Sequence, residues 1–361
     1  MTFTTIAVLG LGKVGHLAAE MLAEAGFEVT GFDSRPIPDT PFSVRHADFA
    51  DAYALRKALE GQEAVLSCLP HAFNKAVASA SHALGAHYFD LTEDVSTTRH
   101  IRGLAASAKG VMAPQCGLAP GFVAIVGAHL ADEFERVRSI RLRVGALPQH
   151  PTGMLGYAFN WSPEGVVNEY LNDCEVIEEG VLKSVSAMEW VETVYVGGVR
   201  LEAFTTSGGL GTMYETYAGR IENLDYKTMR YPGHVALMNF FFHELLMRED
   251  RAAAGRILTH AKPPVDDDVV YVHVAAEGWA SGRLGRKEFV RAYYPVEIGG
   301  ESRTAIAWTT AGSAAAVIEM VQSGALPRQG FLKQESVPLQ SFLATRTGRL
   351  YAELGRQGRR P

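Results

Sequence analysis

The sequence predicts an α/β protein in two parts: an N-terminal doubly wound parallel sheet, and a second α+β domain with a mixed or antiparallel sheet. In the first third of the chain, short apolar strand patterns alternate with helical patterns, and a glycine-rich turn joins the first strand to the first helix. Longer alternating strands dominate the second half. With 361 residues, the chain is long enough to bury two cores.

Composition argues against several classes of partner. The net charge of -6 provides no long-range attraction for nucleic acid or acidic membranes, and no apolar run reaches the roughly 18 residues that span a bilayer. The N-terminus lacks a secretory signal pattern, and the basic residues within 346–360 are typical of a solvated terminus. Three widely spaced cysteines indicate free thiols and a cytoplasmic protein. The absence of CxxC and HxxxH spacings argues against a metal site.

The first 33 residues have the order strand, GxGxxG, helix, strand, acid, which predicts a Rossmann dinucleotide site. Gly10 permits the tight turn, Gly12 lets the backbone approach the pyrophosphate, and Gly15 allows close packing of helix on strand. The helix N-terminus offers N–H groups and a positive dipole to the phosphates. The cofactor contacts expected here are Gly10, Leu11, Gly12, Lys13, Val14, Gly15, Asp33, Ser34 and Arg35.

The residues after the second strand favour NAD over NADP. Asp33 can accept hydrogen bonds from the ribose hydroxyls and repels a 2′-phosphate. Arg35 is close enough in sequence to bind a 2′-phosphate, so NADP stays open.

The alternation of strands and helices continues to residue 115. Strands are expected over 42–49, 63–69, 87–91 and 110–115, and helices over 51–61, 74–84 and 95–108. Asp48, near the end of the third strand, is expected close to the adenine. Ligands of doubly wound sheets lie beyond the carboxyl ends of the strands, so the nicotinamide is expected near the ends of the later strands. The cofactor contacts expected there are Cys68, Leu69, Pro70, Thr92 and Gly117.

Cys116 stands at the end of the sixth strand, between Gln115 and Gly117. Its position predicts that it lines the cavity where hydride moves, or that it is a small residue packed at the edge of the sheet. A covalent thiol mechanism is disfavoured, because no partner histidine can be identified and nothing predicts a lowered pKa.

The pattern changes after Gly121. A helix over 121–134 leads into strands at 138–145, 269–279 and 289–300, a hairpin at 188–206, and helices near 164–171, 210–218 and 233–247. The segment 304–327 reads as strand, turn and helix, and is expected to return to the first domain. The expected domains are 1–121 for dinucleotide binding, 122–304 for substrate binding and dimerisation, and 305–361 as the returning segment.

Three stretches of the second domain combine polar and aromatic residues with glycine and proline: 147–165, 202–213 and 225–235. Together they suit a shaped pocket better than a plain core, although each alone, such as the one that contains His234, is more often structural. Ser162 and Pro163 form a helix start, where Glu164 also suits the helix dipole.

These stretches, with GLGKVG and CGLAPG, resemble the saccharopine dehydrogenase-like family over nearly the whole chain, and especially its members that oxidise L-lysine. The resemblance implies NAD(P)-linked oxidation or reduction at a C–N bond, a homodimer built through the second domain, and a substrate cleft between domains. It implies that Asp90 and Cys116 face the nicotinamide and substrate. The residues it places in the substrate pocket are Tyr157, Trp161 and Thr206, and the polar stretch 225–235 adds Tyr231 and His234 as substrate candidates.

Glu164 is a departure from the pattern of the glutamate-forming reductases of this family, which carry an arginine there for a substrate carboxylate. An acid can instead receive an ammonium, which favours free lysine, oxidised at its ε-carbon with release of ammonia. That reaction needs a base, and Asp90 and Glu93 are candidates, although hydrogen bonding of the loop or the ribose would explain both acids equally well. A saccharopine-type C–N oxidoreductase and a non-catalytic NAD(P)-binding module are the alternatives.

Overall fold

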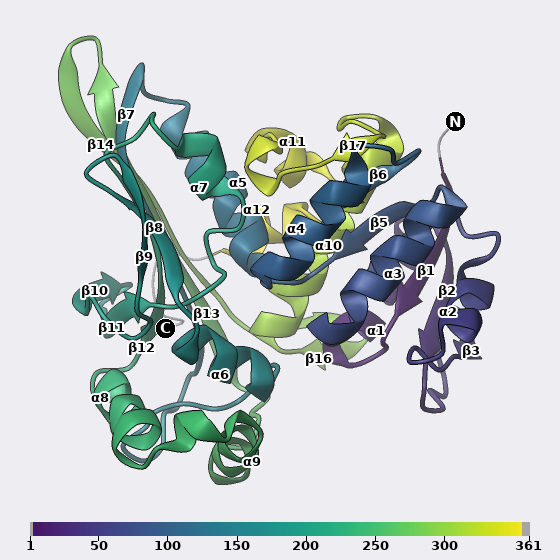
Figure 1. The fold of residues 1–361 in the computed structure, drawn as a ribbon, viewed down its shortest axis with the longest axis horizontal. Coiled ribbons are helices and arrows are strands. Elements are labelled where there is room, and N and C mark those ends of the chain that lie inside the picture. The colour runs from purple at the N-terminus through teal and green to yellow at the C-terminus, as the bar shows by residue number, and fades with distance from the viewer. Residues whose placement is uncertain (1–2, 356–361) are drawn as a thin grey trace. The chain divides into compact units, whose positions relative to one another are not determined.

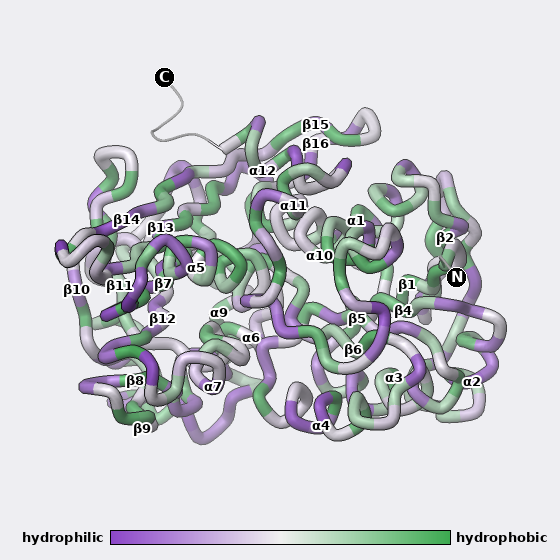
Figure 2. Tube along the Cα trace, turned by 90° about the horizontal axis from the view of Figure 1, so that it is seen from above, coloured by the Kyte–Doolittle hydropathy of each residue, from purple (hydrophilic) through white to green (hydrophobic). Residues whose placement is uncertain are grey.

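The structure, a computed structural model, describes residues 3–355, and the chain divides into two compact units. The first contains the chain up to Ile125 together with Ala307–Glu353, and the second contains Val126–Ile306. Two helices carry the chain across these boundaries, α5 (Val123–Ala131) and α10 (Ala305–Ser323). Most of α5 is hydrophobic (Figure 2). Within the described residues, no helix is long and apolar enough to cross a membrane.

In the described part of the first unit, seven parallel strands form one sheet in the order β17-β6-β5-β4-β1-β2-β3 (Figure 1). The strands are β1 (Thr5–Leu9), β2 (Glu28–Asp33), β3 (Ser43–His46), β4 (Ala64–Ser67), β5 (His87–Asp90), β6 (Val111–Ala113) and β17 (Gly330–Phe331). The order of the first six is that of a dinucleotide-binding doubly wound sheet, so the predicted fold class is confirmed for this unit.

Helices cover this sheet in two groups. The first group is α2 (Ala52–Leu59), α3 (His71–Leu84) and α4 (Val95–Ala105), in which α3 contacts both of the others. The second contains α1 (Lys13–Glu24), α10, α11 (Leu339–Ala344) and α12 (Arg349–Leu354). Met21 of α1 and Tyr351 of α12 both lie about 4 Å from where a Cβ on Gly312 of α10 would stand, so the returning segment completes this layer.

The second unit contains a mixed sheet, which confirms the second part of the predicted fold class. Its main path, within the described residues, is β10-β11-β12-β7-β13-β14, and β8 joins it at β12 and pairs with β9. Only the β12–β7 pair is parallel among these pairings. The strands are β7 (Arg136–Pro148), β8 (Cys174–Glu178), β9 (Val181–Val185), β10 (Glu192–Val196), β11 (Val199–Thr205), β12 (Asn223–Arg230), β13 (Asp268–Ala280) and β14 (Arg283–Tyr293), with a separate hairpin of β15 (Val296–Ile298) and β16 (Glu301–Arg303).

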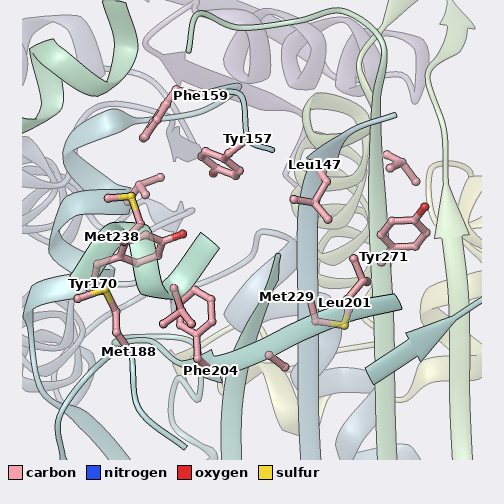
Figure 3. Packing of buried hydrophobic residues seen from close by; sticks show 14 of the residues in the cluster. Leu147, Tyr157, Phe159, Tyr170, Met188, Leu201, Phe204, Met229, Met238 and Tyr271 are labelled. Carbon is pink, nitrogen blue, oxygen red and sulfur yellow. The ribbon is translucent and has the colours of Figure 1, made fainter. Parts of the chain in front are cut away.

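The second unit has a core rich in aromatic side chains and methionine (Figure 3). Tyr170 and Phe204 meet edge to face, and Phe242 packs against the same tyrosine. The helices of this unit are α6 (Pro163–Leu171), α7 (Met213–Tyr217), α8 (His234–Asn239), the π-helical turn Phe240–Glu244, and α9 (Arg251–Ala261). Tyr157 and Phe159, from the loop before α6, also meet edge to face in this core.

Three expectations differ from the structure. The strand predicted at 289–300 is interrupted, because β14 ends at Tyr293 and β15 begins at Val296 in a separate hairpin. The strand predicted at the start of 304–327 is wrong, because α10 begins at Ala305 and its first N–H groups bind the buried carboxylate of Asp268. The β-branched residues there, Thr304 and Ile306, suggested a strand, but this cap and the small residues that follow favour a helix. In addition, no strand was expected in 225–235, but residues 225–230 belong to strand β12. The polar residues of this strand conceal the alternation of apolar and polar side chains that indicates a strand.

We predict that Gly15→Ala destabilises the first unit by about 3 kcal/mol or more, because a Cβ at Gly15 would lie 1.9 Å from the carbonyl oxygen of Gly10. The matched control is Gly103→Ala in α4, where nothing lies within 4 Å of the added Cβ. That change should stabilise the helix by about 0.5–1 kcal/mol. Thermal melting of both variants is the measurement, and equal melting temperatures would contradict the prediction.

Candidate functional site

The glycine-rich loop between β1 and α1 is shaped to receive an anion. Gly10 has a φ of +85°, and its N–H donates to the carbonyl oxygen of Phe32 at 2.8 Å. Among the described residues, no side chain caps α1 at Gly12, and its first turn carries no acid. The first turn of α1 therefore presents backbone N–H groups at which a phosphate can bind. The helix lies so close to the loop that a Cβ on Gly15 could not fit.

Asp33, at the end of β2, holds this loop from the side. One carboxylate oxygen accepts from the N–H of Leu11 at 2.8 Å, and the other accepts from the N–H and Nε of Arg35 at 2.9 and 3.2 Å. Burial alone would raise the pKa of Asp33, but these hydrogen bonds and the nearby guanidinium lower it below its ordinary value. The Asp33 side chain is 6% exposed and that of Arg35 is 68% exposed, so the arginine lies at the solvent-exposed rim.

A cavity of about 350 Å³ in the first unit brings most of the predicted cofactor contacts together. This volume lies in the range of small-molecule sites, roughly 300–1,000 Å³. Its lining residues are Gly10, Gly12, Asp33, Ser34, Arg35, Asp48, Phe49, Ala50, Cys68, Leu69, Pro70 and Phe73. Three of these residues were not predicted from the sequence, Phe49, Ala50 and Phe73, although the first two follow Asp48 directly. Leu11, Lys13, Val14 and Gly15 belong to the loop and the start of α1 and do not line the cavity.

The carboxylate of Asp90 joins the ends of β5 and β6. One oxygen accepts from the N–H groups of Thr92 and Gln115 at 3.1 and 2.9 Å, and the other accepts from the hydroxyl of Tyr88 at 2.8 Å. Burial raises the pKa of Asp90 to about 7, against the opposing effect of these donors. The contacts are those of a residue that holds the loop, which is one of the two roles expected for it.

Cys116 is fully buried behind this loop. Its Sγ donates to the carbonyl oxygen of Ala113 at 3.2 Å and accepts from Nε2 of Gln334 at 3.3 Å. Burial, with a contribution from the charge of Asp90, raises the pKa of the thiol. The surroundings are those of a packed residue and disfavour a thiolate. Gln334 was missed by the sequence analysis, since it lies 218 positions away from Cys116 and no local pattern connects them.

Glu93 differs from Asp90 in its exposure. It follows β5 by three residues, is partly exposed, and burial raises its pKa while the nearby His71 opposes that effect. Thr92 is buried, and its hydroxyl oxygen accepts from the N–H of Asp94 at 3.1 Å. Gly117 lies at the end of the β6 loop, with Thr310 and Leu91 against it. The first unit therefore presents one partly exposed acid with a raised pKa beside the end of β5.

In the second unit, His234 belongs to a directional hydrogen-bond chain. Its Nδ1 lies 3.0 Å from the carbonyl oxygen of Leu155, which can only accept, so Nδ1 carries the proton. Its Nε2 then accepts from the hydroxyl of Tyr170 at 2.9 Å, and that hydroxyl accepts from Nε of Arg230 at 2.8 Å. Burial and the adjacent guanidinium lower the pKa of His234 to about 3, so the ring stays neutral.

The other residues predicted for substrate binding lie in different surroundings. Tyr157 and Thr206 are buried, and neither hydroxyl makes a hydrogen bond of normal geometry with the described residues, although Trp161 lies beside Tyr157. The ring of Trp161 covers Gly165 of α6. Tyr231 donates from its hydroxyl to the carbonyl oxygen of Pro148 at 2.9 Å.

Glu164 is exposed in the first turn of α6, where Ser162 caps the helix. Two charged residues of this unit, Arg230 of β12 and Glu169 of α6, were not predicted as site residues. They interact in the structure, because the carboxylate of Glu169 raises the pKa of Arg230. No group of three or more His, Cys, Asp or Glu is arranged to hold a metal in residues 3–355.

Two family models match the chain: the saccharopine dehydrogenase NADP binding domain over residues 6–113, and the saccharopine dehydrogenase C-terminal domain over residues 117–353. A curated relative, the saccharopine dehydrogenase (NADP(+), L-glutamate-forming) of Schizosaccharomyces pombe, is 24% identical over 152 residues, or 40% of this chain. The match spans 34% of that relative, about a third of its length.

Solved structures support the fold. The apo saccharopine dehydrogenase (L-Glu forming) of Saccharomyces cerevisiae has a TM-score of 0.76 at 18% identity, covering 98% of this chain and 99% of that one. An engineered D-amino acid dehydrogenase bound to NADP+ has a TM-score of 0.52 at 12% identity, with the same coverage of both chains. Because the C-terminal family model alone covers more than half of the sequence, the chain belongs to the saccharopine dehydrogenase family, as its motifs indicated.

Proposed function

We propose that this protein oxidises free L-lysine at its ε-carbon with a nicotinamide dinucleotide and releases ammonia, the activity of an L-lysine 6-dehydrogenase. The family acts on C–N bonds and its N-terminal model is a dinucleotide-binding domain. The observation that carries the proposal is the cavity of the first unit, in which the glycine loop, Asp33 and the end of β4 meet.

The charge of the amine dictates the first step. The ε-ammonium of lysine has an ordinary pKa of about 10.4 and must lose a proton before its carbon can give up a hydride. The bound dinucleotide supplies the hydride acceptor. Glu93 is the acid that we propose to take the proton, because it is partly exposed, whereas both oxygens of Asp90 already accept hydrogen bonds. Water then adds to the imine, and loss of ammonia gives the aldehyde.

The choice of lysine within the family rests on Glu164. Its carboxylate is exposed at the start of α6, where it can receive an ammonium group but would repel the glutamate part of saccharopine. The helix dipole also stabilises an acid in this turn, so position alone does not separate the two roles.

We predict that a screen of amino acids and diamines with NAD and NADP, followed by absorbance of the reduced cofactor, finds L-lysine as the best substrate and ammonia as a product. Glu164→Arg should lower kcat/KM for lysine by about tenfold, since the loss of an attractive contact and the gain of a repulsive one each cost up to about 1 kcal/mol at an exposed position. The same variant is also assayed for a gain of saccharopine oxidation. The charge-matched control is Glu244→Arg, an exposed acid of the same unit.

The outcome decides between roles. Better oxidation of saccharopine to glutamate than of lysine by the parent protein would overturn the choice of substrate and leave Glu164 as a helix-start residue. Absence of reduced cofactor with every amine and amino acid would favour a binding module without catalysis.

We predict that NAD is preferred over NADP. Asp33→Asn should lower kcat/KM for NAD by roughly 10- to 100-fold, because a hydrogen bond to a charged group contributes about 1.5–3 kcal/mol and each 1.4 kcal/mol is tenfold. Arg35→Ala is the companion variant, and it should leave kcat/KM for NAD nearly unchanged. If the parent has the higher kcat/KM with NADP, and Arg35→Ala removes that advantage, the arginine determines the choice.

We predict that Cys116→Ser retains measurable turnover. Hydride transfer from an amine requires no thiolate, and burial raises the pKa of this thiol. Steady-state turnover is measured beside thermal melting and cofactor binding. Complete loss of turnover in a variant that still folds and binds cofactor would show a chemical role for the sulfur.

A further inference from the structure

A buried positive charge in the second unit lacks a partner of opposite charge. This charge is that of Arg230, which lies at the end of β12 and is 2% exposed. Its Nε donates to Tyr170, and its Nη1 donates to the hydroxyl of Thr228 at 2.7 Å and to the carbonyl oxygen of Met229 at 2.9 Å. A guanidinium has five N–H donors, so these bonds use three and leave the two on Nη2.

No carboxylate of the described chain lies within ion-pair distance of this guanidinium, and its ionic attraction to Glu169 acts over a longer range. Burial lowers the pKa of Arg230. The surrounding Tyr157, Tyr170 and Glu169 raise that pKa by more than burial lowers it, so the guanidinium stays charged. Removal of an unpaired charge from water is costly, because the interior does not replace the lost hydration. A ligand carboxylate would supply the missing charge.

The second unit also contains buried hydroxyl groups without partners in the described chain. The guanidinium lies 4.6 Å from the centre of the Tyr157 ring, and the hydroxyl of that tyrosine has no hydrogen bond of normal geometry within the described chain. The hydroxyl oxygen of Thr206 is likewise buried without a partner among residues 3–355.

We propose that Arg230 and the hydroxyl of Tyr157 form a subsite for a carboxylate, which holds the α-carboxylate of an amino-acid substrate. The assignment of that carboxylate to the amino acid rests on the proposed function. A guanidinium suits this task because its planar donors match carboxylate geometry and its charge is permanent. Tyr170 accepts a hydrogen bond from Nε of the arginine and donates one to the neutral His234. These two residues therefore fix the position of the arginine without adding a second charge.

The experiment compares L-lysine with 1,5-diaminopentane, which has the same carbon chain and amine but lacks the carboxylate. In Arg230→Met, kcat/KM for lysine should fall about a hundredfold or more, mainly through KM, while kcat/KM for the diamine should change little. Arg230→Lys should recover part of the loss for lysine. Arg256→Met, in the exposed face of α9, is the matched control.

A second measurement does not depend on oxidation. Calorimetry should detect binding of L-norleucine to the parent protein with cofactor present, and binding should weaken about a hundredfold in Arg230→Met and about tenfold in Tyr157→Phe. The smaller change in Tyr157→Phe keeps the test available if Arg230→Met does not fold. Thermal melting identifies the folded variants.

The outcomes separate the two proposals. If the parent protein does not oxidise lysine but binds norleucine through Arg230, the proposed function fails and the subsite stands. If folded Arg230 and Tyr157 variants lose lysine and diamine oxidation equally, or bind norleucine as the parent does, the arginine is a structural cation stacked on tyrosines. Absence of norleucine binding to the parent protein also overturns the subsite.

Discussion

The buried carboxylate of Asp90 is the interaction on which the arrangement of the β5 and β6 ends depends. Through Thr92 and Gln115 it ties the loops after two adjacent strands to one point, and Gln115 is held with a φ of +68°. The backbone N–H of Cys116 donates to the carbonyl oxygen of Asp90, which adds a further link. The ends of β5 and β6 therefore form one rigid edge, and side chains on this edge keep their positions for a ligand.

The second unit contains a buried side chain of the opposite charge, which is also held in place by hydrogen bonds. Its buried charge is positive, and neutral acceptors surround it: the hydroxyl groups of Tyr170 and Thr228, and a carbonyl oxygen. Each hydroxyl can also donate a hydrogen bond of its own, and the hydroxyl of Tyr170 donates to Nε2 of His234. A network of this kind orients a guanidinium without neutralising it, which leaves its charge available to a ligand.

Local pattern explains what could be predicted. The strand–glycine loop–helix unit and the alternation that follows depend on neighbouring residues, so the sequence indicated the parallel sheet and most of the cavity around Asp33. By contrast, β17 has two residues and pairs with a strand more than two hundred positions earlier. Gln334 and Arg230 were missed for the same reason, because their roles come from contacts between segments distant in sequence.

The two acids near the end of β5 illustrate how burial separates roles that sequence cannot. A base must reach the proton it removes, directly or through one water. The oxygens of Asp90 accept hydrogen bonds from backbone N–H groups and a tyrosine hydroxyl. The pKa of Asp90 is raised because the carboxylate that holds the loop is buried away from water. Glu93 also has a raised pKa, but it is partly exposed, and the backbone hydrogen bond that opposes this rise comes from its own residue. For the proposed reaction, Glu93 is therefore the better candidate for proton transfer, and Asp90 is the residue that positions the strand ends around it.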